Sequence, residues 1–341
     1  MPVSKGLTYD FFSSLCTGNF PSETELIESM DTAVSVLESE SSLYRPAADD
    51  GTPGGLLDFT GNDVPVIVVP DLHGRYKFLL DLLSSDSSAI RFVPSGMNVL
   101  EALGEGLLKI VCLGDGIHSE TDDASERWKK CYEEWEHGNF CGSAMCDEMH
   151  RNVSTMGIVV ELKKAFPENF HFLKGNHENI MNEFGNGNYP FRKFSLEGEI
   201  TRSFMQYMFG DAVLHLIDCF EKTLPLCAVF KNFALSHAEP VSAFTRSEII
   251  NCRKNSSVIE GLTWTPNGSA LEGSVVSTFE SVNPGAETSG SVWIGGHRPV
   301  RGKFSLRQNG SYVQIHNPYE MNVALCSPQN KFNPQEDIVS V

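Results

Sequence analysis

The sequence predicts an α/β or α+β sandwich in which buried strands alternate with helices. From Val64 onward the chain contains short, β-rich apolar runs, and each run ends in a cluster of Gly, Asp, His or Asn. Helical patterns fill several of the gaps between these runs. Strands as apolar as these are typical of sheets that are covered on both faces. A chain of 341 residues is long enough for one large domain with insertions.

The elements follow from these patterns. The predicted strands are residues 64–69, 107–113, 170–173, 233–235 and 292–294, and the predicted helices are residues 76–83, 146–166 and 197–220. Toward the C-terminus, residues 303–306, 312–316 and 322–326 predict a strand meander, in which Asn309 and Gly310 form a hairpin turn.

The domain organisation has one main unit with additions. Residues 1–60 predict an N-terminal helical arm and linker, because a helical pattern at 23–37 is followed by a polar, Gly-rich stretch. Residues 61–330 form the main domain and 331–341 a C-terminal tail. Within the domain, the charged, Trp-containing segment 121–152 predicts a helical cap insertion. The segment 252–290 is rich in Ser, Thr, Asn and Gly, and predicts a long surface excursion.

Charge and composition exclude several classes of protein. The 44 acidic and 26 basic residues give a net charge of −18, which repels nucleic-acid phosphates and anionic lipid, so neither nucleic acid nor a membrane is an expected partner. No apolar run approaches the roughly 20 residues of a membrane span. Residues 1–12 also lack a long apolar region, so a cytoplasmic location is expected. Nine cysteines, an odd number, indicate reduced thiols.

Residues with metal-binding side chains follow the predicted strands. Asp71 and His73 follow the strand at 64–69, and Asp115 follows the strand at 107–113. The others are Asn176 and His177 after 170–173, His237 after 233–235 and His297 after 292–294. Loops beyond the carboxyl ends of such strands meet in one crevice. We therefore expect these side chains to share a site.

The types of side chain indicate which chemistry this site performs. Carboxylate, imidazole and amide oxygen without thiolate suit Mn, Fe, Zn or Mg. Six ligands are too many for one catalytic ion, but they suit two ions about 3.5 to 4 Å apart that share a carboxylate. The sequence therefore predicts a hydrolytic dinuclear centre.

The strings around these residues resemble a known family. They are PDLHG at 70–74, GD at 114–115, GNHE at 175–178, SHAEP at 236–240 and GGH at 295–297. Together, and in this order, they resemble the five blocks of the calcineurin-like metallophosphoesterases. They look most like the branch that holds the Ser/Thr phosphoprotein phosphatases and the bacterial diadenosine tetraphosphatases. No second histidine stands two residues after His297, which fits the phosphoprotein-phosphatase side better than the branch with G-H-x-H.

The resemblance implies a calcineurin-like β-sandwich flanked by helices, with a role for each matched residue. Asp71 and His73 would hold the first ion, Asp115 would bridge, and the second ion would be held by Asn176, His237 and His297. His177 would act as the general acid. The expected activity is hydrolysis of a phosphomonoester or phosphoanhydride through a metal-bridging hydroxide. The two ions would be Mn, Fe or Zn, and the substrate a phosphorylated small molecule or a phosphoprotein.

The second block departs from the family pattern. Residues 114–120 read GDGIHSE where the phosphoprotein phosphatases read GD-x-x-D-R-G. His118 stands at the position of the aspartate that orients the general acid, and is otherwise expected to be a solvated loop residue. Glu120 or Glu178 is an alternative for the orienting role. The arginine that clamps the phosphate is missing from this block.

A phosphate still needs cationic donors, for which guanidinium is well suited. Arg253, upstream of a segment similar to the family's Trp-x-x-Pro stretch, is the first candidate for a catalytic and substrate-binding arginine; Arg298 and Arg75 are the rivals. Two other functions stay open: a dinucleotide polyphosphate hydrolase or phosphodiesterase, and a catalytically silent metal-binding scaffold.

Overall fold

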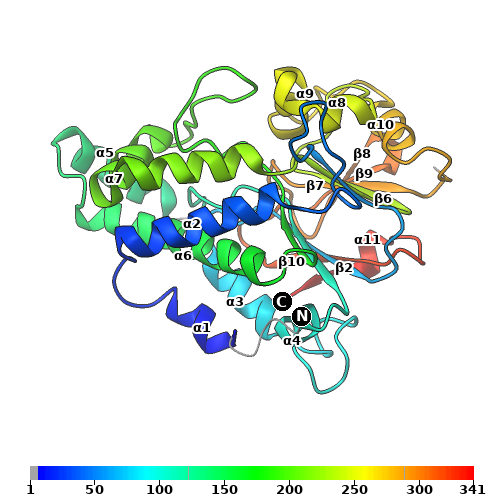
Figure 1. Ribbon diagram of the computed structural model, residues 1–341, viewed down its shortest axis with the longest axis horizontal. Helices are drawn as coiled ribbons and strands as arrows, with labels where there is room; N and C mark the ends of the chain where they lie inside the picture. The colour runs from blue at the N-terminus through cyan, green and yellow to red at the C-terminus, as the bar shows by residue number, and fades with distance from the viewer. Residues whose placement is uncertain (1–6, 122, 288) are drawn as a thin grey trace.

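The computed structural model, which describes residues 7–341 apart from 122 and 288, contains two stacked sheets (Figure 1). In spatial order, the six-stranded sheet consists of β1 (Leu56–Phe59), β5 (Cys227–Phe230), β6 (Phe233–Ser236), β7 (Val292–Gly295), β9 (Tyr312–Gln314) and β8 (Ser305–Arg307). The five-stranded sheet consists of β11 (Ile338–Ser340), β10 (Asn322–Cys326), β2 (Val66–Val69), β3 (Lys109–Cys112) and β4 (Phe170–Phe172). The predicted mixed sandwich is confirmed.

The strand directions decide where a site can form. In one sheet β2, β3 and β4 are parallel, and in the other β6, β7 and β9 are parallel. The carboxyl ends within each set of three therefore open at one edge of its sheet.

The interior between the sheets follows from alternation along each strand. Val66 and Val68 of β2 face the other sheet in one apolar cluster with Ile294. Ile67 and Val69, one residue on, face the helices on the opposite side. Because both faces are buried, the strand consists entirely of β-branched apolar residues, as the sequence indicated.

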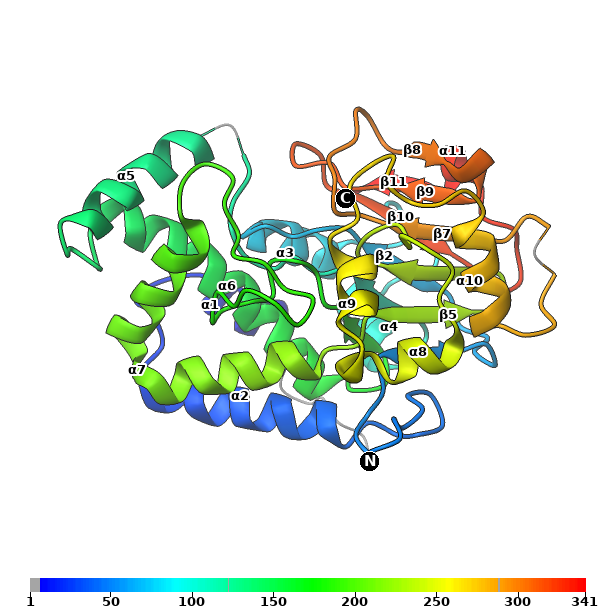
Figure 2. The ribbon, with the colours of Figure 1, turned by 90° about the horizontal axis from the view of Figure 1, so that it is seen from above.

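Helices cover both outer faces of the sandwich (Figure 2). Beside the five-stranded sheet, α3 (Tyr76–Ser84), α4 (Val99–Gly104) and α6 (Ser143–Ala165) share one apolar cluster with its strands. Outside them, α1 (Tyr9–Ser14) packs on α3, and α2 (Glu23–Glu38) packs on α6 and α7 (Glu197–Thr223). On the six-stranded sheet lie α8 (Arg246–Ile250), α9 (Ser256–Thr263) and α10 (Ser274–Val282). To one side, α5 (Ala124–Glu136) and α7 pack with the first part of α6 in an apolar cluster of their own. The short pieces are α11 (Pro334–Asp337), η1 (Cys252–Lys254) and η2 (Gln308–Gly310).

Two expectations need correction. The predicted meander is divided: β8 and β9 form an antiparallel pair, but β10 crosses to the other sheet and pairs with β2 and β11. The segment 252–290 contains α9 and α10, and Val275, Phe279 and Val282 of α10 are buried on the sheet. These three apolar residues at positions i, i+4 and i+7 are the spacing of an amphipathic helix. The many Ser, Thr and Asn residues around them concealed it.

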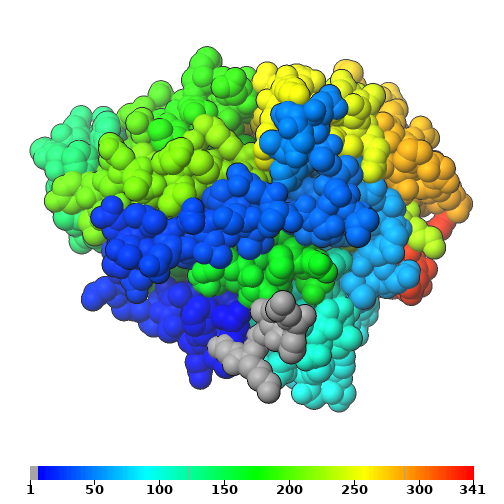
Figure 3. Space-filling model, viewed as in Figure 1, coloured from blue at the N-terminus to red at the C-terminus, as the bar shows by residue number. Residues whose placement is uncertain are grey.

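The N-terminal segment packs closely on the rest of the chain. Figure 3 shows this segment in blue, lying across the green helices, and α2 contacts α7 and α6. Beyond α2, β1 joins the six-stranded sheet beside β5. At the other end, β11 forms the edge of the five-stranded sheet. Both ends of the chain thus contribute a strand to the sandwich, which the sequence did not indicate.

A buried ionic cluster, here the Glu40 cluster, anchors the connection between α2 and β1. The Glu40 carboxylate, whose side chain is 1% exposed, accepts hydrogen bonds from Arg45 and Lys163 and lies 3.4 Å from His171 Nδ1. Arg45 also donates to the carbonyl of Thr223 at the end of α7. Every charge in this cluster therefore faces a charge or dipole of opposite sign.

Within the described residues, no helix is long and apolar enough to span a bilayer. All nine cysteines are free thiols.

Candidate metal centre

The loops that follow β2, β3, β4, β6, β7 and β9 converge, and they bring the six predicted ligands together. Three overlapping groups of His and Asp side chains lie close enough to share an ion. The groups are Asp71, His73 and His316; His73, Asp115 and His177; and Asp71, Asp115 and His237. Asn176 and His297 contact His237, as described below. We call Asp71, His73, Asp115, Asn176, His237, His297 and His316 the metal-ligand cluster.

The first side of the cluster is formed by Asp71, His73 and His316. His73 Nδ1 lies 3.2 Å from the carbonyl oxygen of Ile117, a contact that fixes the ring and leaves Nε2 facing the cluster. From Nε2 the distance to Asp71 Oδ2 is 3.9 Å. His316 Nδ1 lies 3.8 Å from the same oxygen. One carboxylate and two imidazole nitrogens thus face one point.

Asp115 lies at the centre of the cluster. Its Oδ2 is 3.7 Å from His73 Nε2, 3.6 Å from His177 Nε2 and 3.3 Å from His237 Nε2. Its other oxygen, Oδ1, accepts the backbone N–H of His177 at 2.9 Å. This hydrogen bond fixes the carboxylate, so Oδ2 is directed at residues on both sides of the cluster. That is the position expected of a bridging ligand.

The second side is formed by Asn176, His237 and His297. Asn176 Oδ1 lies 2.9 Å from both His237 Nε2 and His297 Nδ1. His237 Nδ1 lies 3.0 Å from the carbonyl oxygen of Leu113, which orients the ring with Nε2 toward the cluster. A backbone contact on the far nitrogen of the imidazole is the usual support of a metal-binding histidine.

Backbone strain is concentrated in the same loops. His73, Asp115 and His297 have φ angles of 45°, 51° and 66°, in the left-handed region that side-chain-bearing residues seldom occupy. Gly296 is required for a different reason, since a Cβ there would lie 1.8 Å from Asp71 Oδ1. Strain that the surrounding structure maintains is typical of functional sites.

Burial sets the charge states of these side chains. It raises the pKa of Asp71 to about 7, and it raises the pKa of Asp115 well above the usual aspartate range, where neighbouring carboxylates add to the effect. It also lowers the pKa of His297 to about 3 and that of His237 well below its ordinary value. The imidazoles are therefore neutral at pH 7, which is the form that binds metal, and a bound cation would favour the ionised form of the two carboxyl groups.

The unpaired atoms test whether divalent ions fit. Of ten buried side-chain nitrogen and oxygen atoms without a hydrogen-bond partner among the described residues, four belong to the cluster. They are Asp71 Oδ1, His73 Nε2, His297 Nε2 and His316 Nδ1. Buried polar atoms are nearly always paired, so a concentration of unpaired nitrogen and oxygen atoms fits a site that binds cations. Oxygen and imidazole donors are compatible with Mn, Fe or Zn.

His316 is the ligand candidate that the sequence analysis missed. It was included in a predicted strand at 312–316, but β9 ends at Gln314, so His316 follows a strand end like the other ligands. Its Nε2 lies 3.1 Å from Glu120 Oε2, and the other oxygen of that carboxylate is paired with Lys193. This carboxylate–imidazole contact leaves Nδ1 free for the cluster.

His177 belongs to a buried relay of three side chains. His177 Nδ1 lies 3.0 Å from His118 Nδ1, and His118 Nε2 lies 3.0 Å from Thr201 Oγ1 on α7. The ring of Phe191 packs 3.5 Å from that of His177, centroid to centroid. His118 is 4% exposed, so the expectation of a solvated loop residue is wrong.

The two alternative orienting residues lie elsewhere. The Glu178 carboxylate accepts backbone N–H groups of Asp115, Gly116 and Gly175, and so holds two of the site loops together. Glu120 is paired with His316 and Lys193. In the described part of the chain neither carboxylate bonds to the His177 side chain, which leaves His118 as its partner.

Of the three candidate arginines, Arg75 makes four hydrogen bonds to backbone carbonyl groups. Its nitrogens donate to the carbonyl oxygens of Asp71, Leu72, Asn317 and Glu320. Arg75 therefore ties the loop after β2 to the loop before β10. These hydrogen bonds argue against a role in binding phosphate.

The other two differ in what surrounds them. Arg253 is exposed on η1, beside Asp50 of the N-terminal segment, and within residues 7–341 apart from 122 and 288 it makes no hydrogen bond or ion pair with the metal-ligand cluster. Arg298 is exposed directly beside His297, and its charge helps to lower the pKa of that histidine after burial. Among the described residues its guanidinium has no partner. Of the three arginines, Arg298 is best placed to bind a phosphate at the metal-ligand cluster.

Comparison with known proteins extends the description of the fold. No protein-family model and no curated protein matches this sequence. Among solved structures, the chain resembles a protein serine/threonine phosphatase from Saccharomyces cerevisiae with similarity to human phosphatase PP5. Identity to this protein is 14%, coverage is 98% of this chain and 95% of that one, and the TM-score is 0.58. A cold-active protein-tyrosine phosphatase of Shewanella sp. is 12% identical, with coverage of 79% and 76% and a TM-score of 0.44. The chain thus has the fold of the yeast phosphatase.

Proposed function

We propose that this protein is a phosphoesterase of the calcineurin-like type, which hydrolyses a phosphomonoester or phosphoanhydride with two divalent ions. The observation that carries the proposal is the metal-ligand cluster, in which six buried side chains and the half-buried His297 face one another from six loops. Asp71, His73 and His316 would hold one ion, and Asp115 would be shared. The second would be held by Asn176, His237 and His297. When bound, such ions polarise phosphoryl oxygens and activate water.

The altered second block supports an acid role for His177 in a different arrangement. If the Thr201 hydroxyl donates to His118 Nε2, His118 Nδ1–H donates to His177 Nδ1. The proton of the neutral His177 ring is then on Nε2, the nitrogen 3.6 Å from Asp115 Oδ2. For the acid step His177 would carry a proton on both ring nitrogens, with its Nδ1–H donating to His118 Nδ1 and His118 Nε2–H donating to the Thr201 hydroxyl oxygen. Transfer of the Nε2 proton to the leaving-group oxygen would then leave a neutral His177. His118 takes the place of the family's aspartate as the positioning residue.

Substrate phosphate needs a cation at the entrance, and we assign this role to Arg298. Arg298→Ala should raise KM and weaken inhibition by inorganic phosphate with little change in kcat, whereas Arg253→Ala, the matched control, should leave both as in the wild type. The expected loss is about tenfold, typical of one charge-assisted contact. An Arg253→Ala variant with the larger defect would reverse the assignment.

The substrate class can be tested directly. Purified protein supplied with Mn²⁺ should hydrolyse p-nitrophenyl phosphate, and the rates on bis-p-nitrophenyl phosphate and diadenosine tetraphosphate then separate a phosphomonoesterase from the alternative diesterase or dinucleotide polyphosphate hydrolase. The arginine that the family has in its second block is absent from residues 114–120. A metal-binding scaffold without catalytic activity therefore remains the competing function. Uptake of metal without turnover of any of these esters would support the scaffold and reject the proposal.

A further inference from the structure

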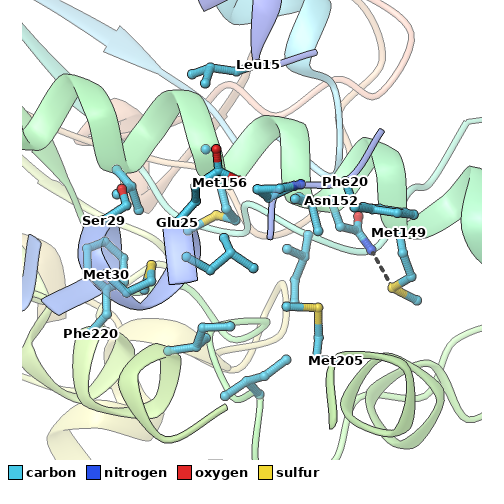
Figure 4. A pocket seen from close by; sticks show the side chains of 18 of the residues that line it. Leu15, Phe20, Glu25, Ser29, Met30, Met149, Asn152, Met156, Met205 and Phe220 are labelled. Atoms are coloured by element: carbon cyan, nitrogen blue, oxygen red, sulfur yellow. Dashed lines mark hydrogen bonds between the residues drawn. The ribbon is translucent and has the colours of Figure 1, made fainter. Parts of the chain in front are cut away.

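A cavity of about 410 Å³ lies between the N-terminal segment, α6 and α7 (Figure 4). Its lining includes Phe20 and Met30 from the N-terminal segment, Met149 and Met156 from α6, and Met205 and Phe220 from α7. Protein interiors are close-packed and hold few voids larger than a water molecule. The volume falls within the roughly 300 to 1,000 Å³ of small-molecule pockets.

Gly157, in the middle of α6, keeps the cavity wide. A Cβ at this position would meet nothing within 4 Å, and the residue is not in the left-handed region. Neither packing nor backbone geometry therefore requires a glycine here, although glycine weakens a helix interior relative to alanine. The missing side chain leaves space that a ligand can occupy.

The lining suits an apolar ligand of variable shape. Its four methionines, Met30, Met149, Met156 and Met205, are flexible side chains that adapt to irregular surfaces. The charged residues in the described lining are all glutamates: Glu25, Glu161, Glu178 and Glu221. Glu161 is paired with Lys164, and burial raises the pKa of Glu221 to about 8. No lining residue that the structure describes is basic, so the cavity offers no partner for the charge of an anionic ligand.

The cavity lies behind the metal-ligand cluster and shares a wall with it. Ile117 and Thr201 line the cavity, and Thr201 also contacts His118. No member of the metal-ligand cluster is part of the lining. A molecule in the cavity can therefore be bound at the same time as a phosphate at the cluster.

We propose that this cavity binds a small, largely apolar molecule without negative charge, which bridges the N-terminal segment to α6 and α7. The proposal does not depend on hydrolysis by the chain. Because the ligand contacts three parts of the fold, its binding also stabilises the folded protein by mass action.

The neutral fluorophore N-phenyl-1-naphthylamine tests this proposal on the full chain. Its fluorescence should rise saturably, with one site per chain, and should fall when decan-1-ol or decylamine displaces it. Decanoate should not compete, and inorganic phosphate should leave the signal unchanged. The absence of a saturable signal would overturn the cavity as a ligand site. Equal displacement by decanoate would overturn the charge preference, and displacement by phosphate would place the probe at the cluster.

A matched pair of variants locates the probe. Gly157→Leu fills the space and should weaken probe binding at least about tenfold. Gly157→Ala adds only a methyl group, should raise the melting temperature and should bind the probe nearly as the wild type does. If Gly157→Leu proves unstable, Val153→Phe, also in the lining on α6, plugs the cavity from another position. Unchanged affinity in a folded plugged variant would overturn the proposal.

Discussion

The chain contains two buried polar clusters that differ in how their charges are satisfied. In the Glu40 cluster, Glu40 is bound by Arg45 and Lys163, with His171 beside it. In the metal-ligand cluster, carboxylates and imidazoles face one another, and four buried atoms have no hydrogen-bond partner among the described residues. A cluster of the first kind holds the fold together, whereas one of the second kind is costly until a cation is bound. The contrast separates structure from function without reference to any motif.

The largest effect is expected from Asp115→Asn. Asp115 faces His73 on one side of the cluster and His237 on the other, so its replacement removes a charge that both ions would share. We expect activity to fall by about 10⁴-fold or more, the loss of several kcal/mol of transition-state stabilisation. Hydrolysis assays with saturating Mn²⁺ measure this loss. Full activity in a folded Asp115→Asn protein would reject the bridging role.

His177→Ala should separate acid catalysis from metal binding. We expect metal content to stay at the wild-type level, while kcat falls roughly 10²- to 10⁴-fold for esters with poor leaving groups and less for p-nitrophenyl phosphate. Metal analysis and a leaving-group series on the same preparation measure both effects. An equal loss for all leaving groups would argue against proton donation by His177.

Glu40→Ala tests the other cluster. Removing one partner leaves two buried cations unpaired, so we expect the free energy of unfolding to fall by about 3 to 5 kcal/mol. Glu38→Ala, on the exposed end of α2, is the matched control and should change stability little. Denaturant titration measures both variants, and a loss as small as that of the control would show that the Glu40 cluster does not hold the fold.

The same variant should change how stability depends on pH. Burial alone would raise the pKa of Glu40, but the hydrogen bond with His171 and the charges of Lys163 and Arg45 lower it below the usual glutamate value. Ionised Glu40 therefore stabilises the folded protein above the unfolded-state pKa, and this stabilisation is lost as the pH falls. The acid limb of the wild-type stability curve should be steeper than that of Glu40→Ala.

The smallest effect is expected from the relay behind His177. Thr201→Val removes the hydroxyl that contacts His118, and should lower kcat by about 10- to 100-fold without changing KM or metal content. Thr201→Ser retains the hydroxyl and should keep most of the activity. If the two variants behave alike, the hydroxyl does not position His118.

The sequence predicted most side chains of the site because residues of metal-binding types stand directly after predicted strands. Short loops after parallel strands leave little freedom, so Asp71, Asp115 and His237 could be placed together from their order alone. His316 obeys the same rule and was missed only because its strand ends two residues earlier than predicted. Only the structure, in which the pairing of β9 with β7 ends at Gln314, shows that His316 follows a strand end.

The arginines could not be assigned in this way. A long side chain reaches groups that are distant in sequence, and the carbonyl of Asn317 that engages Arg75 is 242 residues away. The two end strands, β1 and β11, were missed for a related reason, since each is stabilised by a partner strand rather than by its own pattern. The α10 helix was missed for a different reason. Its apolar residues have helical spacing in the sequence, but the many polar residues around them led to the prediction of a surface excursion.

The metal content of the purified protein tests the central claim most directly. After incubation with Mn²⁺ and removal of free ions, elemental analysis should find about two ions per chain in the wild type, and markedly less in Asp115→Asn. The Glu40→Ala variant, where it is folded, should retain the wild-type content. A folded wild-type chain that takes up no divalent ion would contradict the account.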